Sequence, residues 1–186
     1  MRKYSLFYIV LWIGIVTVLS GCNTLWQPLN GRYTEELDFT VDAAGVETLD
    51  AETTNGDIIA TATDTPQIAV HVVKTIRALT DEKAKEYAPQ VEVSVEREGN
   101  TIQIQYTQPS LWKKVQVNVE YNILCPPQLD LFLGTTNGAI RVTGVEKSVD
   151  ARTTNGDATL SGGHGIIGMH PTNGSIHVER SRGSSD

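Results

Sequence analysis

Hydrophobic and polar residues alternate through most of the second half of the chain, which is the two-residue period of a half-buried β-strand. A step of 18 residues superimposes this half of the chain on itself and produces four apolar columns. The columns are Leu131, Val149 and Ile167; Leu133, Ala151 and Met169; Ile140, Ala158 and Ile176; and Val142, Leu160 and Val178. An earlier segment fits the same columns with Leu49, Ala51, Ile58 and Ala60. The pattern predicts a repeat of strand, corner, strand and second turn.

A recurring Thr-Asn-Gly marks the corner of each repeat. The four corner pairs are Asn55 and Gly56, Asn137 and Gly138, Asn155 and Gly156, and Asn173 and Gly174. Successive pairs are 82, 18 and 18 residues apart. Four such pairs do not arise by chance in so short a chain, so the repeat determines the fold prediction.

Two architectures fit this repeat, and both are all-β. Asn-Gly is the strongest short hairpin signal, so an antiparallel β meander or sandwich is one alternative. The other is a β-solenoid, in which each repeat is one coil and equivalent residues stack in register. Stacked coils explain why Thr and Asn recur, because asparagines then form an amide ladder and threonines pack their methyl groups and bond their hydroxyls. The repeat therefore favours the solenoid, with glycine supplying a positive φ at the corner.

Residues 63–128 are too long for one coil and form an insert between the first repeat and the second. Their patterns predict a strand through Ile68, Val70 and Val72, a capped helix at 80–88, a hairpin at 91–106 and a strand at 115–121. We expect these elements to extend the side or the end of the stack rather than to form a separate domain.

Residues 1–21 have the form of a bacterial leader. Arg2 and Lys3 precede an apolar run that ends at Leu19, and this run is shorter than the roughly 20 residues of a membrane-spanning helix. The sequence Leu19-Ser20-Gly21-Cys22 follows and resembles the lipobox of bacterial lipoproteins. The resemblance implies cleavage before Cys22, a diacylglyceryl group on its sulfur and acylation, commonly by palmitate, of its new amino terminus.

A lipid anchor would hold the mature chain on the outer side of a membrane, and stable anchoring takes at least two acyl chains. Asn23 rather than Asp follows the cysteine, which favours the outer membrane if the host is Gram-negative. We expect residues 22–36 to be a lipidated tether, residues 37–179 to be the β-repeat domain, and residues 180–186 to be a polar tail.

The order of these features resembles a family of bacterial envelope proteins whose domain of unknown function carries the label "putative adhesin". Members have an I-x-V-P strand end, matched here by Ile123-Leu124-Cys125-Pro126, then a leucine strand and successive T-x-N-G-x-I repeats. The resemblance covers residues 37–179 and implies a right-handed β-solenoid-like fold and an envelope location. Cys125 stands where the family usually has an aliphatic residue.

Charge and cysteine content exclude several classes of function. The formal net charge is −7, and loss of Arg2 and Lys3 with the leader makes it more negative. Such a surface repels a phosphate backbone and no basic block compensates, so we expect no nucleic-acid partner. Two cysteines, one of them Cys22, cannot build a disulfide scaffold. We expect Cys125 to be a small buried hydrophobe.

The repeat columns lack the residue sets that catalysis and metal binding require. Acidic residues alternate with other residues down both columns that contain them: Asp57, Ala139, Asp157 and Ser175 in one, and Asp50, Phe132, Asp150 and Gly168 in the other. His164, His170 and His177 fall in different columns, so we expect surface histidines and not zinc ligands. No cofactor, no metal and no enzymatic activity are therefore expected.

These features predict a lipid-anchored cell-envelope protein with a non-catalytic binding, adhesin-like or scaffolding role. Its partners would be the membrane, through the lipid, and envelope glycans or proteins. Two alternatives remain open at this point: an envelope-stress or regulatory partner protein, and a polysaccharide-acting enzyme built on a β-helix.

Overall fold

The computed structural model describes residues 28–109, 114–163 and 167–179. The leader, the lipobox with Cys22, His164 and the polar tail lie outside these residues. The strands are β1 Gly31–Asp42, β2 Thr48–Asn55, β3 Ile58–Ala62, β4 Gln67–Ala78, β5 Glu92–Glu98, β6 Thr101–Thr107, β7 Gln116–Cys125, β8 Asp130–Asn137, β9 Ile140–Thr143, β10 Val149–Asn155, β11 Ala158–Ser161, β12 Ile167–Asn173 and β13 Ile176–Glu179. The helical elements are α2 Asp81–Tyr87 and the 3-10 helix η1 Ala88–Gln90.

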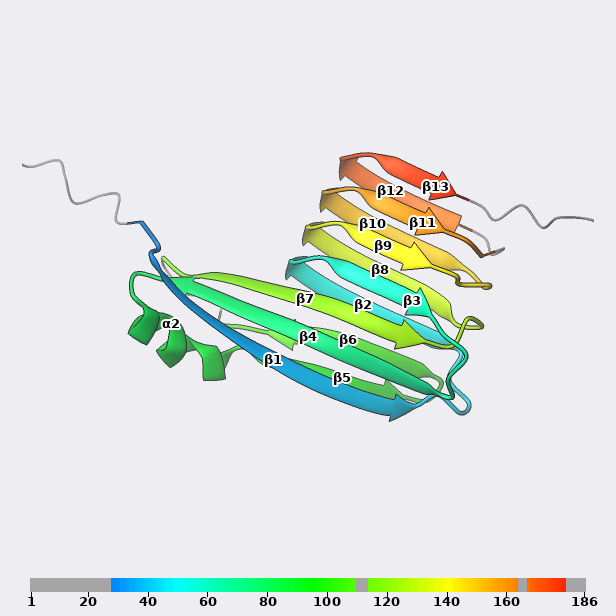
Figure 1. Ribbon diagram of the computed structural model, residues 1–186, viewed down its shortest axis with the longest axis horizontal. Coiled ribbons are helices and arrows are strands. Elements are labelled where there is room, and N and C mark those ends of the chain that lie inside the picture. The colour runs from blue at the N-terminus through cyan, green and yellow to red at the C-terminus, as the bar shows by residue number, and fades with distance from the viewer. Residues whose placement is uncertain (1–27, 110–113, 164–166, 180–186) are drawn as a thin grey trace, which may run out of the picture.

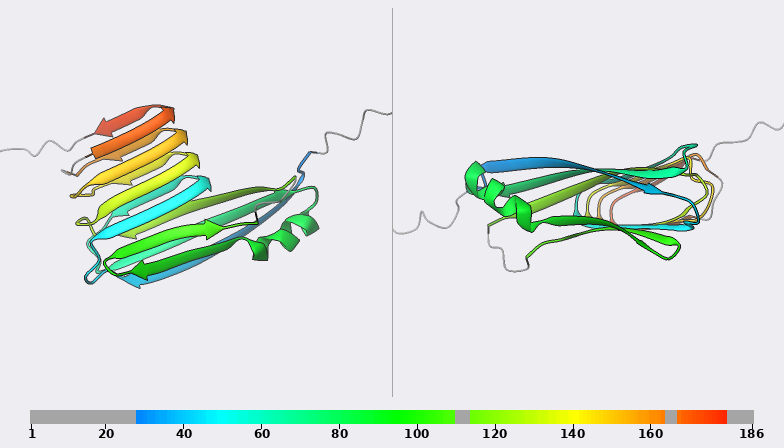
Figure 2. Two further views of the ribbon diagram at one scale, coloured as in Figure 1. Left: turned by 180° about the vertical axis from the view of Figure 1, so that it is seen from behind. Right: turned by 90° about the horizontal axis from the view of Figure 1, so that it is seen from below.

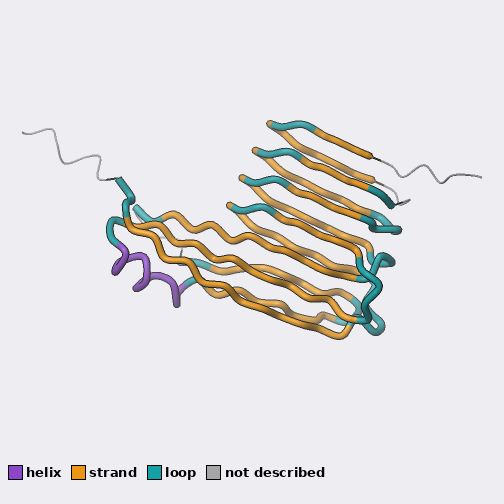
Figure 3. The backbone as a smooth tube through the Cα atoms, in the orientation of Figure 1, coloured by secondary structure: helices purple, strands orange, loops and turns teal. Residues whose placement is uncertain are grey.

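The strands form two mixed sheets that enclose a common core (Figure 1). One sheet has seven strands in the order β1-β4-β7-β3-β9-β11-β13, and the other has six in the order β12-β10-β8-β2-β6-β5. Figure 2 shows the two layers from behind and from below, and Figure 3 shows how little of the described chain is helical. The predicted all-β class is confirmed.

Each repeat contributes one strand to each sheet. In the second repeat, for example, β8 precedes the corner and belongs to the six-stranded sheet, whereas β9 follows the corner and belongs to the seven-stranded sheet. Equivalent strands of neighbouring repeats pair in parallel at the predicted step, so that Leu131 lies opposite Val149 and Val149 lies opposite Ile167. The two strands that flank a corner belong to different sheets. The corner is therefore not a hairpin turn, and the antiparallel meander does not describe the repeats.

The apolar columns supply the core between the sheets. On β2, Leu49 and Ala51 are fully buried, and equivalent residues on β8 and β10 are buried as well. Burial of one Val, Leu or Ile side chain stabilises a fold by roughly 1.5–3 kcal/mol. At the last repeat the residues of these columns become exposed to solvent, with Ile176 50% and Val178 40% exposed.

The insert extends both sheets beyond the first repeat. Strand β7 pairs in parallel with β3 and antiparallel with β4, and β4 pairs antiparallel with β1. In the other sheet, β6 pairs in parallel with β2 and antiparallel with β5. The predicted hairpin and helix are confirmed, and Thr80 caps α2 by accepting a hydrogen bond from the Lys83 backbone N–H at 3.3 Å.

Strand β1 differs from the expected tether. It begins at Gly31, six residues before Leu37, and pairs with β4 along its whole length. A Cβ on Gly31 would lie 1.9 Å from the Thr80 carbonyl carbon, so the strand starts tightly packed against the cap of α2. Polar residues between 32 and 36 hide the alternation in the sequence, although Tyr33 and Glu35 face the partly buried side.

A buried lysine on β4 forms an ion pair with a partly exposed glutamate on β1. The side chain of Lys74 is 5% exposed, and its Nζ lies 2.7 Å from Glu35 Oε2. The same Nζ donates to the carbonyl oxygens of Ala88 at 3.1 Å and Val91 at 3.0 Å. Three acceptors satisfy the three ammonium hydrogens, as burial of a charge requires. Lys74 therefore has a structural role, which is to hold η1 against the sheet.

The corner asparagines form a continuous amide ladder. Asn137 Nδ2 donates to Asn55 Oδ1 at 2.7 Å. The next two rungs repeat this contact, from Asn155 to Asn137 at 2.7 Å and from Asn173 to Asn155 at 3.0 Å. Asn137 and Asn155 thus each use one amide hydrogen toward the preceding repeat and accept one hydrogen bond from the next.

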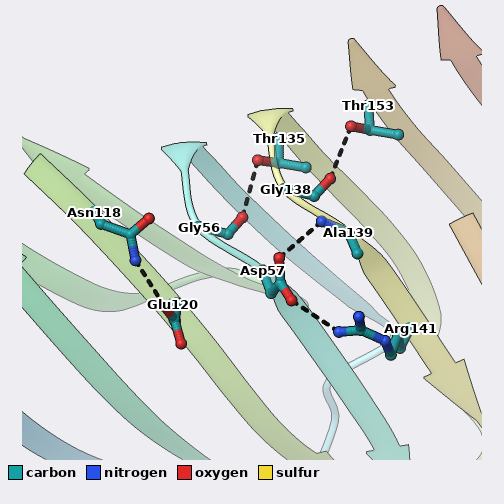
Figure 4. Close-up of polar contacts among 9 residues, drawn as sticks. All are labelled: Gly56, Asp57, Asn118, Glu120, Thr135, Gly138, Ala139, Arg141 and Thr153. Carbon is teal, nitrogen blue, oxygen red and sulfur yellow. Dashed lines mark hydrogen bonds and ion pairs between the residues drawn. The ribbon is translucent and has the colours of Figure 1, made fainter. Parts of the chain in front are cut away.

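The buried threonines two residues before the corner asparagines of the second and third repeats bond the backbone of the preceding repeat. Thr135 Oγ1 donates to the Gly56 carbonyl at 3.1 Å, and Thr153 Oγ1 donates to the Gly138 carbonyl at 3.0 Å (Figure 4). Asp57 adds a further contact between repeats, since its Oδ1 accepts from the Ala139 N–H at 2.8 Å. Thr135 and Thr153 thus point inward to a carbonyl group, whereas the hydroxyl bonding expected between the threonines directly before the corner asparagines stays a prediction.

Close approach of the repeats, rather than turn conformation, explains the corner glycines. A Cβ on Gly138 would lie 2.0 Å from the Gly56 carbonyl oxygen, and one on Gly156 would lie 2.0 Å from that of Gly138. Positive φ angles occur at Gly56 and Gly156 but not at Gly138 or Gly174. The expected positive φ is therefore not shared by the four corners, whereas the lack of room for a side chain is.

We expect Gly138→Ala to lower the free energy of unfolding by about 1–3 kcal/mol, the usual cost of overpacking, because the new methyl group overlaps backbone. Urea unfolding followed by circular dichroism measures this change. Gly134→Ala is the matched control in the same repeat, since its Cβ would meet only the flexible Glu52 side chain at 3.6 Å. An equal loss in both variants would contradict the close-approach explanation.

Candidate functional site

The outer face of the six-stranded sheet is polar, because alternate residues of each strand point away from the core. Two rows of side chains cross β12, β10, β8 and β2 in register: Gly168, Asp150, Phe132 and Asp50, and beside them His170, Arg152, Gly134 and Glu52. A third row is formed by the exposed threonines that precede the corner asparagines: Thr54, Thr136, Thr154 and Thr172. We call these three rows the outer face.

A hollow of about 540 Å³ opens on the outer face where β2 and β6 separate. The two strands pair only as far as Ala51 and Ile104, although both continue beyond these residues. Gln105 and Tyr106 line one side of the hollow, and the threonine row, Arg152 and His170 line the other. Gly134 keeps the floor open between Glu52 and Arg152.

A smaller hollow of about 130 Å³ adjoins the first and shares Glu52, Gly134 and Arg152 with it. Its other lining residues include Phe132, Asp50 and Asp150. Phe132 is 45% exposed and lies between the two aspartates in the strand register. The acidic residues do alternate down their column, but Glu52 of the neighbouring row joins them around one aromatic ring. The cluster cannot be recognised from one column of the repeat, because Glu52 belongs to the neighbouring column.

Two buried side-chain oxygens in the described part of the chain lack a hydrogen-bond partner, and both belong to residues that line these hollows. They are Tyr106 Oη and Asp150 Oδ1. The other oxygen of Asp150, Oδ2, accepts from Arg152 at 2.6 Å. A buried polar atom without a partner costs roughly 1–3 kcal/mol. A ligand hydroxyl group that reached either oxygen would recover this free energy.

The outer face is acidic, and its carboxylates differ in pKa and in ion pairing. Burial raises the pKa of Asp50, and the neighbouring Glu52 raises it further. Arg152 is the cation of the two hollows and is bound to Asp150. The face therefore offers carboxylate acceptors beside an aromatic ring, an arrangement suited to binding a neutral hydroxylated molecule.

The residues singled out in the sequence lie in different places. The corner pairs make the ladder already described and are engaged in contacts between repeats. His170 lines the larger hollow, whereas His177 belongs to the other sheet and lies 3.0 Å from Glu179. Within residues 28–109, 114–163 and 167–179, no group of three or more His, Cys, Asp or Glu side chains is arranged to hold a metal ion. No helix in these ranges has the length and apolar character needed to cross a membrane.

Comparisons with known proteins find similarity only among solved structures. No protein-family model and no curated protein sequence matches the chain. A putative cell adhesion protein from Clostridium sporogenes is 11% identical, with 80% of this chain and 100% of that chain covered and a TM-score of 0.40. A putative adhesin from Parabacteroides distasonis is 11% identical, with 81% and 66% covered and a TM-score of 0.43. A putative lipid binding protein from the same species is 16% identical, with 80% and 63% covered and a TM-score of 0.35.

Cys125 is a free, fully buried thiol, as expected, and burial raises its pKa to about 11. Because the thiolate is the reactive form, we expect iodoacetamide to alkylate Cys125 at pH 8 more than about 100-fold more slowly than free cysteine. Mass spectrometry of a Cys22→Ser chain measures the rate, with the same chain in urea as the fast control. Alkylation of the folded chain at the rate of free cysteine would disprove the burial.

Proposed function

We propose that this chain is a lipid-anchored protein of the bacterial envelope that binds a glycan on its outer face without catalysis. One observation carries the proposal: the buried oxygens of Tyr106 and Asp150 that lack partners belong to residues lining adjoining hollows of one exposed surface. The role is adhesin-like, in that the protein holds a surface polymer and does not transform it.

The chemistry of the outer face fits a sugar. An apolar face of a sugar ring packs on Phe132, and its hydroxyl groups donate to the carboxylates of Asp50 and Asp150 on either side. An aromatic platform with a few directed polar groups is the usual composition of a small-ligand site. The exposed threonine row adds hydroxyl groups, which both donate and accept hydrogen bonds.

We further propose that the stacked repeats are a short right-handed β-solenoid. The parallel, in-register pairing at a step of 18 residues supports this fold, as does the alternation of strands between the two sheets. The right hand follows from the strong preference of parallel crossover connections for that hand. Stacked coils repeat the threonine row at one strand spacing, about 4.8 Å, which suits a polymer of repeating units.

We expect the mature chain, carrying Cys22→Ser, to bind selected oligosaccharides in an array of envelope polysaccharide fragments. Phe132→Ala and Asp150→Asn should each weaken that binding by about tenfold, equivalent to ~1.4 kcal/mol, because one removes the ring and the other the negatively charged carboxylate. Leu124→Ala is the matched control, since Leu124 is 47% exposed but lies on the other sheet.

The same array separates the alternatives. Equal binding by all four proteins would exclude the outer face as the site. Release of shortened sugars would contradict a non-catalytic role and favour a polysaccharide-acting enzyme. Retention of one envelope protein and of no glycan would contradict the glycan proposal and favour a regulatory partner.

The lipid anchor has its own test. We expect labelled palmitate to be incorporated into the wild-type chain in a bacterial host and to be lost in Cys22→Ser, because the lipobox directs modification to that residue. Cys125→Ser is the matched control and should keep the label. Label that persists in Cys22→Ser would disprove anchoring at this cysteine.

A further inference from the structure

The long strands β1, β4 and β7 extend beyond the ends of the shorter strands of the repeats. Strands β1, β4 and β7 run past the corners of the repeats (Figure 1), and a hollow of about 470 Å³ lies where they do so. Strands β1, β4 and β7 of the seven-stranded sheet supply most of its lining, and the corner residues Asn55 and Asn137 supply the rest. We call it the basic shelf and define it by Arg32, Arg77, Gln116, Asn118, Asn55 and Asn137.

Two arginines face each other on the basic shelf without a counter-ion. Arg32 and Arg77 are direct partners in the antiparallel register of β1 and β4, so their side chains leave the same face with Cβ atoms roughly 4.5–5.5 Å apart. Like charges placed directly opposite destabilise a sheet. Among the described residues, no ion pair includes either guanidinium. This arrangement is notable in a chain with a net charge of −7.

The carboxylates near the shelf have other partners. Asp81 Oδ1 accepts a hydrogen bond from the Arg32 backbone N–H at 2.8 Å. Glu120, which also lines the hollow, accepts from Asn118 at 2.7 Å. The residue opposite Arg77 on β7 is the neutral Gln116. These carboxylates keep their negative charge, but neither forms an ion pair with the Arg32 or Arg77 guanidinium.

The asparagines of the shelf add donors rather than acceptors. Asn55 Oδ1 accepts from Asn137, and Asn137 Oδ1 accepts from Asn155, so the ladder occupies each oxygen. Each Nδ2 spends one hydrogen, that of Asn55 on the Val117 carbonyl and that of Asn137 on Asn55. An amide nitrogen carries two hydrogens. One N–H donor per asparagine therefore remains for a ligand, which selects for an anion.

We propose that the basic shelf binds a phosphate group, and that this phosphate belongs to a phospholipid headgroup of the membrane that holds the anchor. Two guanidinium forks match phosphate oxygens in pairs of parallel hydrogen bonds. Strand β1 begins nine residues after Cys22, and nine residues span at most roughly 30 Å. The membrane source rests on the proposed lipid anchor, whereas the phosphate site itself does not.

The test follows the arginine side-chain N–H signals of the mature chain, carrying Cys22→Ser, by nuclear magnetic resonance. Three probes are added separately: inorganic phosphate, monomeric short-chain phosphatidylglycerol and glucuronate. We expect Arg32 and Arg77 to shift saturably with both phosphates, and Arg32→Gln and Arg77→Gln each to weaken the affinity at least tenfold. Lys85→Gln removes one positive charge from the neighbouring helix α2 and should leave the affinity unchanged.

Each outcome bears on a different part of the proposal. No saturable shift, or equal binding by Arg77→Gln and the wild-type chain, would overturn the site. Glucuronate binding as tight as phosphate would overturn the choice of phosphate, and binding of inorganic phosphate alone would overturn the lipid source. Phe132→Ala should keep the phosphate shifts, so failure of the glycan proposal is distinguishable from failure of this one. Arg77→Lys, which keeps the charge and loses the fork, should show an intermediate affinity.

Discussion

The contact between the buried threonine of a repeat, Thr135 or Thr153, and the glycine carbonyl of the preceding repeat is the constraint on which the rest of the fold depends. Its 3.0–3.1 Å hydrogen bond brings one backbone against the next, and this distance leaves no room for a side chain on the corner glycine. The asparagine ladder then follows the same spacing. Because corner and ladder act together, neighbouring repeats cannot slip by one residue, which would turn the apolar columns outward.

Fixed register also determines the surface. The strands copy one another residue by residue, so a substitution at one column position changes only one place in an otherwise uniform face. Phe132 is such a substitution, a large ring in a row of small or acidic residues, and Gly134 is another, a missing side chain between Glu52 and Arg152. Together they place an exposed aromatic ring and two adjoining hollows on a sheet face that would otherwise be flat. The variety of the outer face therefore arises from a few exceptions to the repeat.

The repeats were predictable because each structural position occurs several times in one sequence, so the residues at equivalent positions can be compared. Columns such as Ile140, Ala158 and Ile176 identified the strands, their buried faces and their parallel partners. Single-copy features were not predictable in the same way. The start of β1 was missed because its polar residues lack a repeat to compare with, and Tyr106 was missed as a site residue because only tertiary structure brings the insert to β2. The opposition of Arg32 and Arg77 likewise depends on pairing between strands that are distant in sequence.

Strand β7 has a consequence for how such chains change in length. Its Val119 carbonyl accepts a hydrogen bond from Thr53 as the glycine carbonyl of a preceding repeat would, and its Val117 carbonyl accepts from Asn55 in place of an asparagine Oδ1. The insert therefore serves as a template from which the first repeat takes its register. Every later repeat needs only the one before it. Duplication or loss of an 18-residue unit would therefore lengthen or shorten the displayed surface while the insert, and whatever it contacts, stays the same. In this fold the insert sets the register of the strands, and the number of repeats sets the length of the displayed surface.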